Sequence, residues 1–353
     1  MTRLLTAGLT AAAALGLAHG CALQPQVDIS TAAAAVDRLL LTDQQERRIA
    51  HSLGCTIVGR AGTGHYGSVL LATTGGRART QCGRAYRTSS RHVAIKLSPH
   101  PAPTLAVEAA VLRDLAGQPG FPVLRSLVED VGGSGVNALT MEGLGPSLHD
   151  VWETATQSTF FAGPTVLSYG ADLLRCLRRL HAAGFVHNDV KPNNVLFDAG
   201  REAAPGAALP PPLHLIDFGL ATSVTGTLGG ARGTPLFASC AAHEKRPTRP
   251  VHDVESLVYC LAYLASGALP WERKPLARAA FMKRRMLAGA DGCSTLMDAC
   301  EAQRLTEDVH ATETVEALQA LWTEVVAGQE TGAVDYDACL AALEGGGAAG
   351  SDR

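Results

Sequence analysis

The sequence predicts an α+β fold of two lobes, in which a small antiparallel sheet with one main helix precedes a larger, mainly helical lobe. Strand patterns cluster before residue 141, helical patterns dominate after Val166, and 353 residues with 46% hydrophobic content suffice for both lobes. We expect an N-terminal extension over 1–50, a domain over 51–343 with lobes at 52–141 and 142–343, and a flexible tail over 344–353.

Composition and charge exclude several classes of protein. The net charge is −3 and 18% of residues are charged, so the chain can bury a core but has no cationic excess for coating nucleic acid. Direct nucleic-acid binding is therefore not expected. The nine cysteines are scattered and never spaced C-x-x-C, which argues against a disulfide framework or a zinc ribbon and favours reduced thiols.

The N-terminus fits two interpretations. Leu4 to Ala18 is an uncharged Ala/Leu-rich run, and the small-x-small pattern that follows it is typical of a removable signal or transit segment. The run is shorter than the roughly 20 apolar residues of a membrane span. An ordinary Ala-rich extension is the alternative, and both interpretations leave residues 1–50 outside the fold argument.

The small lobe begins with strands and continues into a helix. Three segments read as strands, namely 56–58, 68–72 and 93–95. Residues 73–92 carry five arginines and no acid, which predicts either a solvated loop at the outer edge of the lobe or an anion-contacting surface for an acidic partner or nucleic acid. Leu105, Glu108, Leu112 and Leu115 then recur at helical spacing, which places one carboxylate on an apolar face.

Two segments of the larger lobe stand out. Val251 to Leu264 is apolar on nearly every side, which predicts a helix buried inside the lobe. Residues 199–212 are rich in Ala, Gly and Pro, which predicts a surface insertion between two short strands.

Residues 62–69 match the glycine pattern G-x-G-x-x-G-x-V. The pattern alone fits a plain glycine turn, a dinucleotide site or a phosphate lid. A dinucleotide site needs a helix that begins within the glycines and an acid about 20 residues later. Here a strand follows, and no acid occurs between Gly62 and Val107. We therefore predict a hairpin whose backbone N–H groups can lie over phosphates.

Further polar residues follow at spacings that suit phosphoryl transfer. Lys96 ends the third strand, and Glu108 can anchor its flexible stem, although either residue alone is more often an ordinary surface charge. His187 to Asn194 reads H-x-D-x-K-P-x-N, which has the spacing of a base, a phosphate-binding cation and a metal-binding amide. A strand and Asp217-Phe218-Gly219 come next. The combination is far more specific than any of its parts.

In this order the motifs resemble those of the eukaryotic protein kinase superfamily, over about residues 52–343. The resemblance implies an ATP-dependent Ser/Thr protein kinase in which Asp189 is the base, Lys191 steadies the phosphoryl group and Lys96 contacts ATP phosphates. Asn194 and Asp217 would hold Mg²⁺. The residues it implies for ATP binding are Ala61, Gly62, Thr63, Gly64, His65, Tyr66, Gly67, Ser68, Val69, Lys96, Glu108, Met141, Glu142 and Leu144.

Later residues resemble one branch, the casein kinase I and vaccinia-related kinase group. Residues 141–148 are similar to the casein kinase I hinge, with Met141 behind the adenine and 142–144 as backbone partners. Residues 233–239 lack the acid of the usual A-P-E motif, as in this group. Further matches lie at 253–257 and 269–272, and residues 295–300 lean toward the vaccinia-related side.

Three residues depart from the family pattern. Asn188 replaces an Arg that grips a phosphorylated activation loop in many kinases, so we expect no switching of that kind. Ala61 stands where a larger apolar residue usually packs on adenine. Leu236 replaces an Arg of casein kinase I enzymes, which puts a preference for acidic or prephosphorylated substrates in doubt.

Two alternative functions remain open at this point. A kinase-fold scaffold typically loses the lysine, the base or a metal ligand, whereas all are present here. A small-molecule phosphotransferase would share the ATP site, but residues 233–271 keep the kinase-type region that shapes a protein-substrate platform. The expected partners are ATP and proteins with Ser or Thr acceptors. The family resemblance implies a cytoplasmic or nuclear location, and a monomer is expected.

Overall fold

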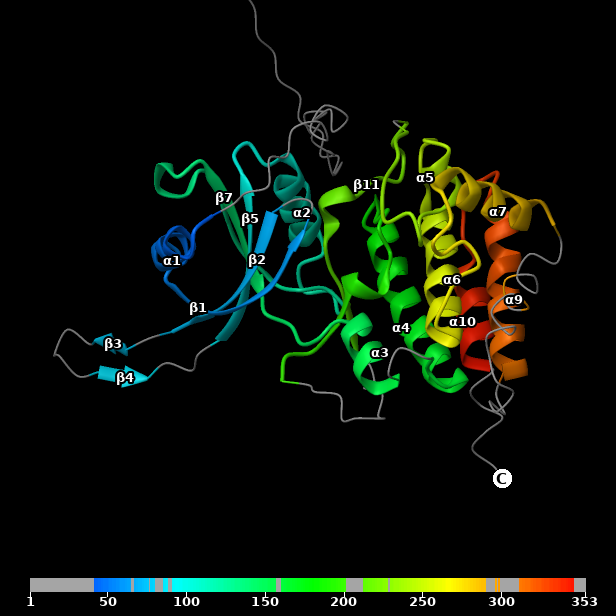
Figure 1. The fold of residues 1–353 in the computed structure, drawn as a ribbon, viewed down its shortest axis with the longest axis horizontal. Helices are drawn as coiled ribbons and strands as arrows, with labels where there is room; N and C mark the ends of the chain where they lie inside the picture. Colours follow the sequence, from blue (N-terminus) through cyan, green and yellow to red (C-terminus); the bar gives the residue numbers. More distant parts are fainter. Residues whose placement is uncertain are drawn as a thin grey trace, which may run out of the picture.

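The computed structural model of the protein describes residues 41–64, 67–75, 77–79, 85–87, 91–156, 160–200, 212–227, 229–289, 296, 298 and 311–345. These residues form the predicted α+β fold, with a small sheet-containing lobe and a mainly helical lobe side by side (Figure 1). None of the described helices has the length and apolar character needed to cross a membrane.

The small lobe is built on a five-stranded antiparallel sheet in the order β1-β2-β5-β7-β6. Its elements are α1 (Asp43–Ser52), β1 (Cys55–Gly64), β2 (Gly67–Thr74), β3 (Arg77–Arg79), β4 (Ala85–Arg87), β5 (Arg91–Pro99), α2 (Pro103–Asp114), β6 (Leu124–Val128), η2 (Val131–Gly133) and β7 (Val136–Glu142). The three predicted strands and the helix around Glu108 are confirmed as β1, β2, β5 and α2.

Each face of this sheet packs against one helix. Side chains alternate between the faces, so Leu70 and Ile95 lie in the cluster with Ile49 and Ala50 of α1. Leu139 lies in the cluster with α2. Figure 1 shows the sheet between the two helices. In this arrangement β5 and α2 both contact residues of the large lobe.

Helix α1 belongs to the stretch that the sequence analysis left outside the fold. A capping box between Thr42 and Gln45 starts it, and Arg60 of β1 forms ion pairs with Asp43 at 2.5 Å and Glu46 at 2.7 Å. Most of the remaining helix residues are charged or polar, so periodicity gave little signal.

The hairpin of β3 and β4 projects from the small lobe, on the side away from the large lobe (Figure 1). It lies within the Arg-rich stretch 73–92, at the outer edge where the loop was predicted. The side chains of its arginines lie outside the described residues, so the proposed contact with an anion stays a prediction.

The large lobe is mainly helical, and its described residues contain two short strand pairs and two 3-10 turns. Its elements are α3 (Leu148–Thr156), α4 (Gly163–Ala182), β8 (Phe185–Val186), η3 (Pro192–Asn194), β9 (Val195–Phe197), β10 (Leu213–Leu215), η4 (Phe218–Leu220), β11 (Thr222–Ser223), α5 (Cys240–His243), α6 (Pro250–Ser266), α7 (Leu276–Ala288), α9 (Ala311–Gly328) and α10 (Tyr336–Gly345). Strands β9 and β10 pair and flank the predicted insertion, whose residues 201–211 lie outside the described part.

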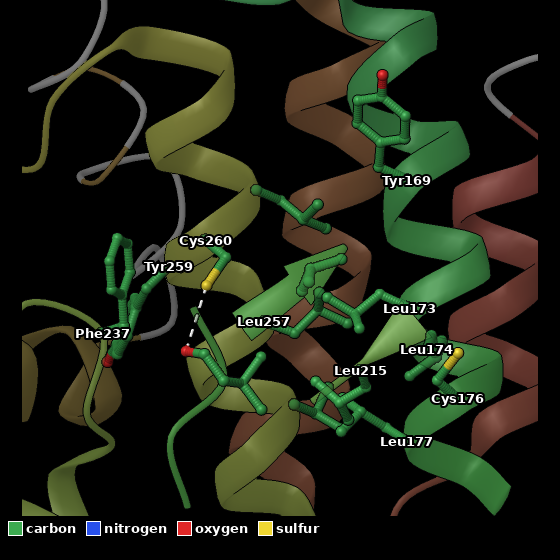
Figure 2. Close-up of a cluster of buried hydrophobic side chains, with 14 of the residues drawn as sticks. Tyr169, Leu173, Leu174, Cys176, Leu177, Leu215, Phe237, Leu257, Tyr259 and Cys260 are labelled. Atoms are coloured by element: carbon green, nitrogen blue, oxygen red, sulfur yellow. Dashed lines mark hydrogen bonds between the residues drawn. The ribbon is translucent and has the colours of Figure 1, made fainter. Parts of the chain in front are cut away.

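Helix α6 is the centre of the large lobe, as its all-round apolar pattern predicted. Fifteen of its residues are buried, and Leu257 lies in one core with Leu173 and Leu177 of α4 (Figure 2). Cys260 of α6 donates from Sγ to the carbonyl oxygen of Val190 at 3.4 Å, the dashed line of Figure 2. The core of the large lobe is therefore in direct contact with the loop that carries Asp189.

Candidate active site

A cavity of about 790 Å³ lies between the two lobes and collects most of the predicted site residues. Strands β1, β2, β5 and β7 form its roof, and the segments from Gly145 to Ser147 and from Asp189 to Asp217 contribute its floor. The predicted residues that line it are Ala61, Gly67, Val69, Lys96, Glu108, Met141, Glu142, Leu144, Asp189, Lys191, Asn194 and Asp217.

Lys96 is held between two carboxylates at the back of this cavity. Its Nζ lies 2.7 Å from Oε2 of Glu108 on α2 and 2.5 Å from Oδ1 of Asp217. Burial opposes the charge of Lys96, but Asp217 and Glu108 together raise its pKa above the usual value. The same ammonium lowers the pKa of Asp217 against the effect of burial. A positioned cation and an ionised carboxylate therefore face the cavity.

The glycine hairpin closes the roof at the β1–β2 turn. Gly64 pairs with Gly67, and a Cβ added at Gly67 would lie 1.7 Å from the carbonyl oxygen of Leu97. Gly67 also has a φ of +135°, which L side chains rarely adopt. Glycine is therefore required at this position for the strand to approach β5. The strand-turn-strand form confirms the hairpin and excludes a helix start.

Five predicted residues of this loop need separate comment. His65 and Tyr66 lie outside the described residues, and only the backbone is described for Gly62 and Thr63. Ser68 is a correction, because its side chain is buried with Leu70 on the opposite face of β2. Strand alternation sends Val69 to the cavity and Ser68 away from it.

Asp189 sits at the floor of the cavity within a dense hydrogen-bond network. Its Oδ1 accepts from the backbone N–H and the hydroxyl of Thr234, at 2.7 and 2.9 Å. Its Oδ2 accepts from Nζ of Lys191 at 2.7 Å. Lys191 also donates to the Thr234 hydroxyl at 2.8 Å. The carboxylate is thus fixed in direction, with a cation beside it.

The loop that presents Asp189 is anchored from the buried helix α6. Asp253 accepts from the N–H groups of His187 at 2.6 Å and Asn188 at 2.9 Å, and it contacts Nε2 of His181 at 2.8 Å. Burial opposes ionisation of Asp253, but these partners lower its pKa. The conformation of the loop that carries Asp189 is therefore fixed by contacts within the protein.

Asn188, the first departure from the family pattern, is itself buried and hydrogen-bonded. Its Nδ2 donates to the carbonyl oxygen of Leu220 at 2.8 Å and to Thr222 at 3.0 Å, and its Oδ1 accepts from Thr248 at 2.5 Å. Its φ of +71° is one that Asn tolerates better than most residues. A neutral side chain thus joins the catalytic loop, the segment after Asp217 and the residues before α6.

Asn194 and Asp217 provide a donor set that suits a hard divalent cation. The amide nitrogen of Asn194 donates to the backbone oxygen of Asp189 at 2.9 Å, so the side-chain oxygen of Asn194 is the atom that could bind a cation. Asp217 contributes an ionised carboxylate that also lines the cavity. Carboxylate and amide oxygens are the ligands that Mg²⁺ prefers, so the residues fit the ion.

The apolar part of the cavity would hold a flat ring. Val69, Ala94 and Met141 line it from the small lobe, and Leu196 and Ile216 line it from the large lobe. At the hinge, Glu142 turns its carboxylate to the N–H of Val123 at 3.2 Å, and the Glu142 N–H donates to the Val123 oxygen at 2.9 Å. This leaves the Glu142 carbonyl and Leu144 to meet a ligand.

Several functional residues were missed from the sequence. Leu71 and Ala94 line the cavity two positions from Val69 and Lys96, so strand alternation could have found them. Asp150 lines the cavity edge and accepts from Ser147 N–H at 2.9 Å, a local S-x-x-D signal. Thr234 was named only within a motif, and its contact with Asp189 spans 45 residues.

Comparisons with known proteins agree with this geometry. A family model described as the protein kinase domain matches residues 56–318. A curated relative, the casein kinase 1-like protein HD16 of Oryza sativa subsp. japonica, is 37% identical over 145 residues. The match covers 38% of this chain and 20% of that protein. The chain therefore belongs to the eukaryotic protein kinase superfamily, and the likeness to HD16 supports the casein kinase 1 group within it.

Proposed function

We propose that this protein transfers the γ-phosphoryl group of Mg-ATP to Ser or Thr hydroxyls of protein substrates. Members of its superfamily use ATP and a divalent metal, and the cavity is lined by Lys96, Asn194 and Asp217, which we assign to these two ligands. The observation that carries the proposal is the Asp189 carboxylate, fixed by Thr234 and Lys191 on the floor of the cavity. A base in that position can accept the proton of an acceptor hydroxyl.

Each residue has a part in this reaction. Lys96, held by Glu108, would contact ATP phosphates, and the glycine hairpin would cover them with backbone N–H groups. Bound Mg²⁺ would neutralise phosphate charge from Asn194 and Asp217. Asp189 would orient the acceptor hydroxyl and take its proton. Lys191 would keep the transferred group next to Asp189, since its ammonium lies 2.7 Å from that carboxylate.

Preference for Ser and Thr is supported by the family resemblance and by Lys191, whose ammonium beside Asp189 suits a short hydroxyl-bearing acceptor. The casein kinase 1-like name of the relative points the same way. The family resemblance further supports a cytoplasmic or nuclear location.

The alternative is a kinase-fold scaffold that binds partners without transfer. An assay with radiolabelled Mg-ATP and dephosphorylated casein tests both functions, with Asp189→Asn as the matched control. Transfer to Ser and Thr by the wild type and its loss in the control supports the kinase. Tight ATP binding without transfer to casein or to any protein of a broad lysate would establish the scaffold.

A further inference from the structure

Lys283 is a buried lysine, and no carboxylate of the described residues lies in direct contact with its ammonium. It lies on α7, its exposed fraction is 0%, and its Nζ points at three backbone carbonyl oxygens. The distances are 3.0 Å to Pro235, 3.0 Å to Leu236 and 2.7 Å to Ala238. Burying a lysine is costly unless its ammonium is hydrogen-bonded, and here all three carbonyl contacts go to one backbone segment.

The three carbonyl acceptors match the three donors of the charged side chain, and Nε2 of His243 at 3.3 Å is a fourth neighbour. An ammonium has three N–H donors, one for each carbonyl, whereas a neutral amine has two donors and a lone pair. Nζ also lies 4.7 Å from the ring centre of Tyr259 and 4.9 Å from that of Trp271, on faces that attract a cation. The arrangement is therefore a cage for an ammonium.

The charge of Lys283 is balanced through Tyr259. The hydroxyl of Tyr259 donates to Oε1 of Glu255 on α6 at 2.9 Å, while its ring faces Lys283. The same Oε1 accepts from the N–H of Cys240 at 2.7 Å. Lys283 thus holds the carbonyl groups of Pro235, Leu236 and Ala238, and Glu255 holds the N–H group of Cys240, two residues further on.

Other titratable groups surround this cage. From α5 come His243, with Nε2 at 3.3 Å from Nζ, together with Cys240 and Glu244; from α6 comes Cys260 besides Glu255 and Tyr259. Burial lowers the pKa of Lys283 to about 7, against the opposing effect of Glu255. Burial and Lys283 lower the pKa of His243 to about 4, so that ring stays neutral near pH 7.

The segment held in this way leads into the catalytic residues. Residues 234–238, the acceptor segment, begin with Thr234, which bonds to both Asp189 and Lys191. Trp271 also donates from Nε1 to the Leu236 oxygen at 2.8 Å. We propose that Lys283 is a positioning residue for the protein acceptor, which fixes the acceptor segment from behind through its three carbonyl contacts. This rests on the proposed kinase function.

Lys283→Met removes the ammonium and keeps the length of the side chain. We expect the KM for casein to rise about three- to tenfold, the loss that a few hydrogen bonds support, while the KM for ATP stays unchanged. Arg285→Met, on the exposed face of the same helix, is the matched control and should leave both constants unchanged. Trp271→Phe should shift the KM for casein in the same direction. Equal changes in both KM values, or none, would overturn the proposal.

The pH profile separates positioning from a general packing role. In the wild type the KM for casein should rise as the pH passes from 6 to 8, because the neutral amine serves only two of three carbonyls. Lys283→Met should lack this step, and Lys283→Arg, which stays charged, should keep the low-pH value throughout. Identical pH profiles in the wild type and in Lys283→Met would contradict the role.

Hydrogen exchange tests whether Lys283 holds the acceptor segment, and this measurement does not depend on catalysis. The amides of residues 234–240 should exchange faster in Lys283→Met than in the wild type, with β5 and the Lys96 region unchanged. If the wild type transfers no phosphate but residues 234–240 still exchange faster in Lys283→Met, the kinase proposal alone is wrong. If residues 234–240 exchange at the same rate in Lys283→Met and in the wild type, the Lys283 proposal alone is wrong.

Discussion

The Nζ atom of Lys96 lies 2.5 Å from Oδ1 of Asp217, although 121 residues separate them in the chain. The contact joins β5 of the small lobe to the residue before η4 of the large lobe. In the proposed mechanism a cation bound by Asp217 would share this carboxylate with Lys96, which would couple metal binding to phosphate binding at one side chain.

Asp217→Ala should abolish metal-dependent transfer. Lys96 keeps its bond to Glu108, so the small lobe should stay intact while the main cation ligand is lost. Calorimetric titration of Mg-ATP and the transfer rate at increasing Mg²⁺ measure the effect. Full activity of the wild type in excess chelator would contradict the role of this carboxylate.

Asp189→Asn should lower kcat by about 10²–10⁴-fold. The amide keeps the size of the side chain but cannot accept a proton, and Lys96 on the opposite wall is untouched. ATP affinity, measured by fluorescence titration, should therefore stay within about twofold of the wild type. A clean preparation that turns over at the normal rate would refute Asp189 as the base.

Gly67→Ala should cost more than about 3 kcal/mol in the free energy of unfolding or abolish ATP binding. The added Cβ would lie 1.7 Å from the Leu97 oxygen at a φ of +135°. Gly59→Ala in the neighbouring strand is the control, since no atom lies within 4 Å of its added Cβ. Urea unfolding and ATP titration of both variants give the comparison, and similar behaviour of the two would exclude the steric argument.

Asn188→Gly should lower kcat while the lobes stay folded. Glycine tolerates the φ of +71°, so the substitution isolates the loss of the side-chain bonds to Leu220, Thr222 and Thr248. Each lost bond is worth about 1 kcal/mol.

The wild type, whose segment is held by the neutral side chain of Asn188, should keep its activity after phosphatase treatment. A large drop on dephosphorylation would show that a phosphate holds this segment instead.

Stability should fall between pH 6.5 and about 4 because of His252. Burial lowers the pKa of His252 to about 4, and its Nδ1 accepts the N–H of Arg249 at 2.7 Å, which requires an unprotonated atom. In this window the unfolded chain takes up a proton that the folded chain refuses. The free energy of unfolding therefore decreases as the pH falls, by up to about 3 kcal/mol.

Thermal unfolding at several pH values measures this dependence. His252→Asn, whose side-chain oxygen can also accept, should show a flatter slope between pH 6.5 and 4. His51→Asn on the exposed face of α1 should keep the slope of the wild type. If His252→Asn loses stability with acid as steeply as the wild type, other groups cause the effect.

Sequence patterns predicted those features that depend only on residues close together in the chain. The glycine pattern at 62–67 and the strand after it predicted a hairpin, and the structure shows that Gly67 is needed where β2 approaches β5. Helix α6 was predicted because its sequence is apolar on nearly every side. The motif around Asp189 placed three functional groups within six residues, so their meeting needs only one loop.

Contacts between distant segments could not be predicted in the same way. Thr234 reaches Asp189 across 45 residues and Asp253 reaches His187 across 66, and neither spacing repeats in a local pattern. Ser68 was assigned to the ATP site because the motif includes it, but strand alternation turns it to the core. Nothing in the sequence near Lys283 distinguishes it from an exposed helix cation, because its burial depends on how α7 packs in the folded lobe.

Ala61 gives this cavity a roof with little side-chain volume next to Val69. Chemical genetics exploits such differences, because an inhibitor can carry a substituent that only a small residue accommodates. A purine scaffold with a branched alkyl group directed at Ala61 should inhibit this enzyme and spare kinases with a larger residue there. An Ala61→Ile variant would then be the resistant allele that proves the target inside a cell.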